Sequence, residues 1–253
     1  MKQLSTRLVF GFLAVIGCFG AARAEDGASP WRGFYIGING GYGAGTGQDD
    51  VTPLPLGPFP GLDELPFSYD HKLKGWLGGA QLGYNWQHDH LVVGLETDID
   101  RAGISGDGAA PLFDFTNHLP ILNAFESGHQ SLEWFGTLRG RIGAEAGGLL
   151  MYGTGGLSYG RVELSELNVT FPGFLPLTFA GSQSTWRTGW TAGLGAEWAF
   201  ASRWSAKAEF LHFDLGSTTV TALPLAPNPP FAVQGVVTTT GNIFRLGVNF
   251  RLN

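Results

Sequence analysis

Cysteine and long apolar runs are nearly missing from this sequence. The chain of 253 residues has one cysteine, Cys18, close to its N-terminus. With no second cysteine there is no disulfide within the chain. Beyond the N-terminal segment, no stretch reaches the roughly 18 consecutive apolar residues that a transmembrane helix needs. If such a chain crosses a bilayer, it does so with β-strands.

Charge is also scarce, and its balance is acidic. Charged residues make up 14% of the chain, with 21 acidic and 15 basic residues and a formal net charge of -6. This acidity argues against a nucleic-acid partner. The chain is instead rich in glycine, with 40 residues, and 13% of its residues are aromatic, with eight tryptophans. Such a composition suits a membrane barrel better than a soluble β-sandwich.

The first 24 residues have the features of an export signal. Lys2 and Arg7 provide a positive start, residues 8–19 an apolar core, and Ala22-Arg23-Ala24 a cleavage site. We expect residues 1–24 to be removed and residues 25–253 to form a single outer-membrane barrel domain. Removal takes away three cations and no acid, so the formal charge changes from -6 to -9.

An alternative fate for the N-terminus depends on Cys18. Residues 15–18 loosely resemble a lipoprotein processing box, which would keep Cys18 as a lipidated first residue. Mass spectrometry of the mature N-terminus distinguishes the two outcomes.

Eight stretches alternate apolar and polar residues with the period of a β-strand. They are residues 34–42, 76–86, 91–100, 132–145, 149–162, 188–198, 204–213 and 244–252. In the clearest stretch, 132–145, one face has Leu132, Trp134, Leu138, Ile142 and Ala144, and the other has Glu133, Thr137, Arg139, Arg141 and Glu145. Buried charges are tolerated only when they are paired, so the charged face is no ordinary core. A lipid-facing exterior around a polar, paired interior accounts for both faces.

The connections between these stretches alternate between short and long. Short turns are expected near His88, Ala146 and Ser202, and long loops at residues 44–74, 101–130, 163–187 and 214–241. Short periplasmic turns and long extracellular loops are typical of outer-membrane barrels. The sequence therefore predicts an all-β fold, an eight-stranded antiparallel up-and-down transmembrane β-barrel with four long extracellular loops.

Several strand motifs resemble those of alphaproteobacterial porin-family proteins, also called outer-membrane immunogenic proteins, which are related to the OmpA-like eight-stranded barrels. The motifs are Gly33-Phe34-Tyr35-Ile36-Gly37, Gly79-Ala80-Gln81-Leu82-Gly83-Tyr84-Asn85-Trp86, Gly94-Leu95-Glu96-Thr97-Asp98, Thr137-Leu138-Arg139-Gly140-Arg141-Ile142-Gly143, Tyr152-Gly153-Thr154-Gly155-Gly156 and Lys207-Ala208-Glu209-Phe210. The resemblance implies a surface-exposed barrel without established catalytic residues. The chain departs from the usual pattern at its last residue, Asn253, where such barrels have an aromatic side chain.

The polar faces of the eight stretches predict a network of charges in the lumen. Its expected members are Glu96, Asp98, Asp100, Glu133, Arg139, Arg141, Glu145, Glu197, Lys207, Glu209, Arg245 and Arg251. Mixed charges in a narrow, low-dielectric space form charge-assisted hydrogen bonds. We expect a plugged, stabilising interior, since eight strands leave just enough room for side chains. The alternative is a small-solute or ion pore gated by these pairs.

Each long loop contains prolines and apolar residues. The aromatic members are Phe59, Phe67, Phe113, Phe115, Phe171, Phe174 and Phe231. We expect these loops to fold onto one another as an apolar cap, whose prolines limit the entropy lost on ordering. The alternative is an exposed apolar patch for a partner or a hydrophobic ligand.

Candidate catalytic and metal-binding residues are few. His212 and Ser205 lie on opposite faces of one strand, which separates a base from its nucleophile. His88 and His90 flank Asp89 in an exposed turn, where solvation is the simpler expectation than a metal site. We expect no catalytic residue, no metal and no cofactor.

The sequence thus predicts a structural and surface-interaction protein of the Gram-negative outer membrane, reached after export through the inner membrane. A small-solute porin is the alternative, and a lipid-modifying barrel enzyme is a more distant one. The expected partners are outer-membrane lipid, periplasmic chaperones, the barrel-insertion machinery and a host or surface partner of the long loops.

Overall fold

The computed structural model describes residues 31–55, 67–113, 120–171, 177–224 and 231–252, and within them the regular elements are all strands. The elements are β1 (Gly33–Pro55), β2 (Phe67–His88), β3 (Leu91–Phe113), β4 (Pro120–Ala146), β5 (Leu149–Phe171), β6 (Leu177–Ala180), β7 (Ser182–Ala199), β8 (Trp204–Pro224) and β9 (Phe231–Arg251). In these ranges, no helix is long and apolar enough to span a membrane. The predicted export signal lies outside the described residues.

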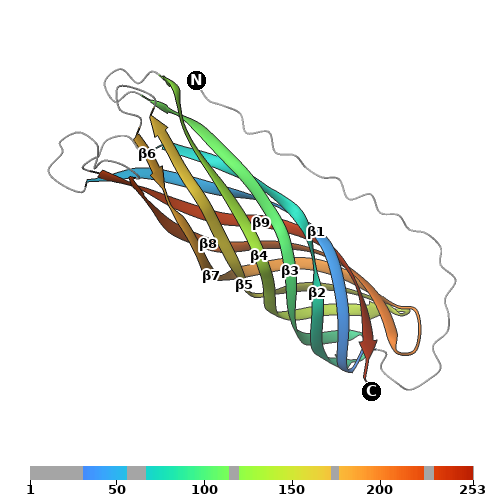
Figure 1. Ribbon diagram of the computed structural model, residues 1–253. Coiled ribbons are helices and arrows are strands. Elements are labelled where there is room, and N and C mark those ends of the chain that lie inside the picture. The colour runs from blue at the N-terminus through green and yellow to red at the C-terminus, as the bar shows by residue number, and fades with distance from the viewer. Residues whose placement is uncertain (1–30, 56–66, 114–119, 172–176, 225–230, 253) are drawn as a thin grey trace, which may run out of the picture.

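Eight long strands close into one antiparallel ring. Neighbours pair in the order β1, β2, β3, β4, β5, β7, β8 and β9, and β9 pairs back with β1. The short strand β6 adds to the far ends of β5 and β8. Figure 1 shows a narrow barrel whose strands are tilted against its long axis. The predicted eight-stranded antiparallel barrel is confirmed.

The short connections all lie at one end of the barrel. Asp89 and His90 join β2 to β3, Gly147 and Gly148 join β4 to β5, and residues 200–203 join β7 to β8. Gly147 and Gly148 have φ angles of 60° and 83°, which glycine adopts without the steric cost of a side chain. The end of β9 lies at this same end, which is the periplasmic one by the rule of short turns (Figure 1).

The strands are longer than the sequence suggested. The eight strands of the ring contain 18 to 27 residues, whereas a tilted strand crosses a bilayer in about 9–11. Much of the predicted loop 44–74 is paired, since the β1–β2 ladder runs out to Val51 opposite Phe67. Residues predicted as long loops therefore extend the barrel on its extracellular side. Inward glycines such as Gly43 and Gly47 had hidden the alternation there.

The outer wall of the membrane-crossing part is apolar. Its most exposed large side chains include Ile38, Trp76, Leu138, Ile142, Met151, Leu157, Leu194 and Leu246. Tryptophans gather at two levels, with Trp86, Trp198 and Trp204 near the short turns and Trp76, Trp134 and Trp186 nearer the other end. Trp86 and Trp76 lie ten positions apart in β2, which is about the length needed to cross a bilayer.

A β-bulge in β4 corrects two predictions. Register shifts between Leu132 and Trp134, so Glu133 and Trp134 both face outward. Leu132, predicted to face lipid, is 1% exposed and packs inside the barrel. Glu133, predicted to face the lumen, ion-pairs with exposed side chains on the outer wall instead. The extra residue of a bulge reverses the inward and outward alternation of the strand beyond it. The sequence of residues 132–145 does not reveal this reversal.

The interior is filled in layers along the barrel axis. At the periplasmic end, Trp31, Val92, Leu150 and Tyr152 form a small apolar cluster. The charged groups lie above it. Above them lies what we call the apolar layer: Leu73, Leu77, Ala102, Ile104, Leu132, Phe135, Val162, Leu164, Leu211, Phe213, Leu215, Val220, Val237 and Ile243.

Candidate functional site

The charged section of the lumen is built around Arg139 of β4. Its Nη2 lies 2.5 Å from Oε1 of Glu96 and 3.1 Å from Oδ2 of Asp98. Its Nε donates to Oγ1 of Thr137 at 2.8 Å, and its Nη1 lies 3.4 Å from Oε1 of Glu209. Strand pairing explains this convergence, because Arg139 is the direct register partner of Glu96 in β3. The Arg139 side chain has no exposed surface and is neutralised on three sides.

Arg245 of β9 joins the same carboxylates from the opposite wall. Its Nη2 lies 2.8 Å from Oδ2 of Asp98, its Nε donates to Oε2 of Glu209 at 2.7 Å, and its Nη1 lies 3.5 Å from Oδ2 of Asp100. Because Asp98 binds both Arg245 and Arg139, the side chains bridge the full width of the barrel.

Lys207 of β8 completes the centre of the network. Its Nζ lies 2.8 Å from Oε1 of Glu96 and 3.3 Å from Oε2 of Glu209. Two tyrosines donate to the same acids at 2.7 Å, the Tyr35 hydroxyl to Glu96 and the Tyr152 hydroxyl to Glu209. Glu96 and Glu209 are therefore each held by two cations, Arg139 and Lys207, and by a neutral tyrosine donor. A buried charge needs such partners.

Arg141 forms a second centre nearer the periplasmic end. Its Nη1 lies 2.9 Å from Oε2 of Glu197, and its Nε donates to Oδ1 of Asn85 at 2.8 Å. Its guanidinium lies 4.7 Å from the ring centre of Tyr35 and 5.3 Å from that of Tyr152. Both rings thus contribute cation–π contacts in a site that excludes solvent.

Neutral side chains extend this second centre across β2, β8 and β9. Oε1 of Glu197 accepts from Oγ of Ser205 at 2.5 Å and from Nδ2 of Asn249 at 2.7 Å. The Gln81 amide in turn donates to Oδ1 of Asn249. Hydrogen bonds therefore link Arg141 to four other strands of the ring through residues that are almost completely buried.

The structure brings nine of the twelve predicted lumen charges into one buried network. They are Glu96, Asp98, Asp100, Arg139, Arg141, Glu197, Lys207, Glu209 and Arg245. The other three lie elsewhere. Glu133 is on the outer wall, Glu145 lies at the periplasmic rim 3.6 Å from His90, and Arg251 donates to the carbonyl of Ser202 in a periplasmic turn. Glu145 and Arg251 fall outside because they lie at the periplasmic ends of β4 and β9, beyond the level of the network.

The predicted network contained charged residues alone, so its neutral members were missed. Tyr35, Asn85 and Asn249 occupy inward positions of the predicted alternation, and the structure places Tyr152 inward as well. A buried carboxylate or guanidinium needs donors and acceptors beyond its ion pair. Polar neutral residues at inward positions were therefore the available signal.

The apolar layer was not predicted, and it closes the barrel above the charges. Phe135, Leu211 and Ile243 have no exposed surface, and the rings of Phe135 and Phe213 lie 5.1 Å apart. Polar side chains return above it, where Gln130 donates to Thr239 at 2.7 Å and His71 lies 3.9 Å from Asp49.

Candidate catalytic and metal-binding residues stay apart in the structure. His212 shares a hydrogen bond of 3.0 Å with Asn242 on the outer wall, while Ser205 donates to Glu197 inside. His88 and His90 are largely exposed at the periplasmic turn. Among residues that the structure describes, no group of three or more His, Cys, Asp or Glu side chains is placed to hold a metal ion.

The predicted apolar loop patch falls on side chains outside the described part of the molecule. This holds for Phe59, Phe67, Phe113, Phe115, Phe171, Phe174 and Phe231. Of these, the backbones of Phe67, Phe113, Phe171 and Phe231 end long strands at the extracellular side. The choice between a cap and an exposed patch stays a prediction.

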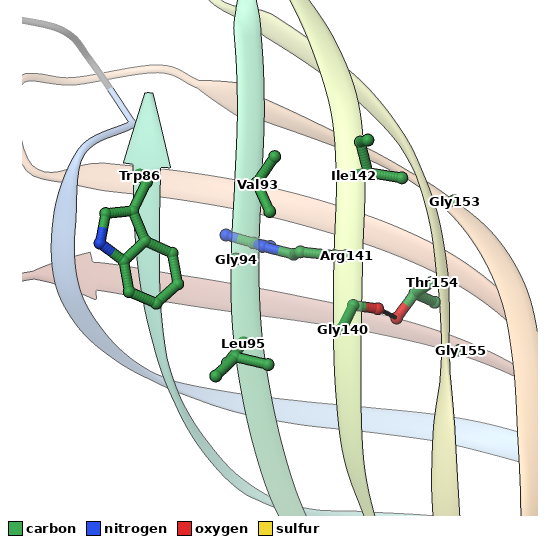
Figure 2. A pocket seen from close by; sticks show the side chains of 10 residues that line it. All are labelled: Trp86, Val93, Gly94, Leu95, Gly140, Arg141, Ile142, Gly153, Thr154 and Gly155. Atoms are coloured by element: carbon green, nitrogen blue, oxygen red, sulfur yellow. Dashed lines mark hydrogen bonds between the residues drawn. The ribbon is translucent and has the colours of Figure 1, made fainter. Parts of the chain in front are cut away.

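A shallow groove of about 520 Å³ lies on the outer wall over β3, β4 and β5. Figure 2 shows Trp86, Val93, Leu95 and Ile142 around it. Four glycines also line it, and three of them, Gly140, Gly153 and Gly155, lie on the outer wall where a side chain would otherwise fill it. The groove exists because these positions lack side chains, and it opens onto the surface that faces hydrocarbon.

Comparison with known proteins gives a consistent assignment. Residues 10–251 match the family described as outer membrane protein beta-barrel domain. The 31 kDa outer-membrane immunogenic protein of Brucella melitensis biotype 1 is 37% identical over 194 residues, which are 74% of this chain and 72% of the relative. The 22 kDa outer membrane protein of Rhizobium leguminosarum bv. viciae is 27% identical over 192 residues, which are 75% of this chain and 67% of that protein.

A solved structure of an outer-membrane protein has a similar fold. The outer membrane protease OmpT of Escherichia coli superposes with a TM-score of 0.50 at 9% identity, covering 87% of this chain and 96% of OmpT. OprG of Pseudomonas aeruginosa superposes with a TM-score of 0.43 at 14% identity, covering 87% and 97%. At such identities the likeness extends to the fold alone.

Proposed function

The chain belongs to the outer membrane protein β-barrel family, and we propose that it is a closed structural barrel of the outer membrane that presents its extracellular end to the surroundings. Its place is the cell outer membrane, as for its relatives. There it spans the bilayer, conducts no solute and displays its extended strands and loops.

The observation that carries this proposal is the apolar layer. Fourteen buried apolar side chains fill one section of the lumen, with contributions from all strands of the ring except β1 and β7. A conducting pore needs a continuous path of water. Such a path would have to expose side chains such as Phe135, Leu211 and Ile243, none of which has exposed surface. Burial of these groups is favourable by about 25 cal/mol per Å² of apolar surface, which opposes opening.

The charged network supports the same conclusion. Its ions are neutralised by direct contacts, such as Arg139 with Glu96 and Arg245 with Asp98. Selective pores place charges where a passing ion can exchange with them. Here the carboxylates are already bound to guanidinium and ammonium groups, so the network favours a plug.

Planar-bilayer conductance of the purified protein tests the closed state. We expect no steady openings for the natural sequence. A double variant, Phe135→Ala with Phe213→Ala, removes the ring pair from the apolar layer and is expected to produce openings. Trp204→Ala, a large-to-small change on the outer wall, is the matched control. Steady openings of the natural protein that vanish in Arg139→Ala or Glu96→Ala would establish a gated pore instead.

We also propose that the barrel is not an enzyme. The relatives are named as outer-membrane immunogenic or outer membrane proteins. The candidate pair of His212 and Ser205 is divided between the outer wall and the lumen. His71 and Asp49 lie close together, but their side chains are each 2% exposed, which leaves no access for a substrate. The likeness to a protease concerns fold and provides no catalytic residue.

A surface partner of the loops remains part of the proposal. The described strands end on the extracellular side of the barrel where the loop segments begin, which supports a role for these segments at the cell surface. Replacing Phe113 and Phe174 by Ser is expected to abolish adhesion or hydrophobic-probe binding. Heat-modifiable migration on gels checks that the barrel still folds. Unchanged binding by a folded double variant would remove the loop aromatics from the proposal.

A further inference from the structure

A row of alternating cations and aromatic rings crosses the outer wall on its extracellular side. Arg101 of β3 is the direct register partner of Trp134 in β4, Trp134 is the partner of Arg161 in β5, and Arg161 is the partner of Trp186 in β7. The side chains of Arg101 and Arg161 are 59% and 45% exposed, and Trp186 is 56% exposed. We call these four residues, together with Glu133, the arginine row.

The arginine row lies at the level where the bilayer ends. Trp134 precedes the periplasmic end of β4, Ala146, by twelve residues, and the apolar positions Leu138 and Ile142 fall between them. A tilted strand needs about 9–11 residues to cross the hydrocarbon. Tryptophan side chains gather at the headgroup level of outer-membrane barrels. The row therefore faces the headgroups of the outer leaflet.

The guanidinium groups of the row are held in place before any ligand arrives. Arg101 lies over the ring of Trp134 at 5.1 Å, and Nε of Arg161 donates to Oγ of Ser184 at 2.9 Å. Both guanidiniums share one carboxylate, since Glu133 lies 3.7 Å from Arg101 and 3.4 Å from Arg161. The bulge of β4 is what turns Glu133 outward between them.

The charge near the arginine row is positive once the neighbouring lysines are counted. A second carboxylate, Glu163 of β5, faces outward two positions from Arg161 and is the register partner of Ser184. With the exposed Lys74 of β2, three cations face these two carboxylates and leave one positive charge, and the exposed Lys72 lies on the same face farther from the membrane. Asp107 on this face is paired with His129 at 2.8 Å, and Asp70 lies beyond the lysines. Each guanidinium has five N–H donors, of which only some are used. The exposure of both side chains leaves the remaining donors accessible to a ligand.

We propose that the arginine row is a docking surface for the phosphate groups of the glycolipid that forms the outer leaflet. Planar guanidinium groups bind phosphate through paired hydrogen bonds, and neighbouring tryptophan rings suit the sugar and headgroup level. This inference rests on the proposed structural role, because it names the lipid that holds the barrel in its leaflet. The groups that contact phosphate are Arg101 and Arg161, while Glu133 limits the net charge.

The test measures binding of diphosphorylated lipid A to the folded, detergent-solubilised barrel by native mass spectrometry. At roughly 1 kcal/mol for each cation near a headgroup, the double variant Arg101→Gln with Arg161→Gln is expected to weaken binding about thirtyfold. The matched control is Arg32→Gln with Arg203→Gln, which removes two exposed cations at the periplasmic end. The control is expected to bind as the natural protein does.

A variant that is expected to strengthen binding distinguishes loss of the site from simple misfolding. Glu133→Gln frees both guanidiniums from their shared carboxylate and is expected to strengthen binding about fivefold. Equal losses in the row and control variants, no loss in the row variant, or weaker binding by Glu133→Gln would overturn the inference. Equal binding of lipid A stripped of its phosphates would overturn it too.

Two further measurements distinguish lipid binding from binding of free phosphate and from the proposed closed barrel. Competition by millimolar inorganic phosphate would mean that the row binds free phosphate and that the lipid is not its partner. Conductance of the same variants is recorded in parallel, since openings would contradict the closed barrel without changing the lipid measurement.

Discussion

At the scale of single residues, the lumen shows how an outer-membrane protein can bury many charges at once. Arg139 contacts three carboxylates and a threonine, and its side chain has no exposed surface. A buried ion pair contributes little net stability compared with apolar residues of the same shape, yet removing one partner is costly. The network therefore fixes which strands face each other more than it adds to overall stability.

Replacing Arg139 by Ala tests this view. The change leaves Glu96 and Asp98 with fewer cations in a section without solvent, so we expect the free energy of unfolding to fall by about 3–5 kcal/mol. Urea unfolding in vesicles, followed by tryptophan fluorescence, measures the loss. Arg203→Ala in the exposed periplasmic turn is the control and should change stability by less than about 0.5 kcal/mol. A loss below about 1 kcal/mol for Arg139→Ala would contradict the account.

At the scale of elements, β4 combines a regular part and a bulge. From Phe135 to Ala144 its side chains alternate strictly, with Arg139 and Arg141 inward and Leu138 and Ile142 outward. The bulge at Glu133 then reverses the alternation and turns Leu132 into the apolar layer. One extra residue thus lets the same strand serve a charged section and an apolar section.

Deletions in β4 separate these two parts. Deleting Glu133 keeps Leu132 inward and Trp134 outward, so we expect a folded, heat-modifiable barrel that loses less than about 2 kcal/mol. Deleting Gly140 instead forces Arg139 or Arg141 onto the lipid face, at about 2–4 kcal/mol for an arginine near the bilayer midplane. That variant is expected to give no heat-modifiable band on cold gels. A folded Gly140 deletion would mean that lipid does not dictate the register.

The membrane-crossing parts of the strands could be predicted because one face of each strand contacts lipid and the other contains charged residues. Residues such as Leu138 and Arg139 cannot exchange places, so the alternation is visible without any knowledge of the partner strands. The extracellular halves of the strands could not be predicted, since both of their faces lie outside hydrocarbon and inward positions such as Gly43 and Gly47 are small. The bulge at Glu133 was hidden for a related reason. Without a bulge, Leu132 and Trp134 share an apolar face and Glu133 lies on the polar one, which is itself a regular alternation.

At the scale of the whole molecule, contacts between distant segments decide function. The hydroxyl of Tyr35 reaches Glu96, and Lys207 reaches the same carboxylate from more than a hundred residues away in sequence. Such pairs follow from closure of the ring and from its register, which a single sequence does not contain. The apolar layer arises in the same way, because its members are spread over six strands of the ring. Closure of the lumen is therefore a property of the assembled barrel.

Cysteine labelling in vesicles tests together whether hydrocarbon contacts the outer wall and whether the lumen excludes water. In a background with Cys18→Ser, one variant has Leu157→Cys, at an outward position that is 62% exposed. A second has Ser158→Cys, at the next and inward position, which is fully buried. We expect Leu157→Cys to react with a lipid-soluble maleimide alone, and Ser158→Cys to react with neither a lipid-soluble nor a charged, water-soluble maleimide until the barrel is unfolded. Rapid reaction of folded Ser158→Cys with the charged reagent would contradict the account.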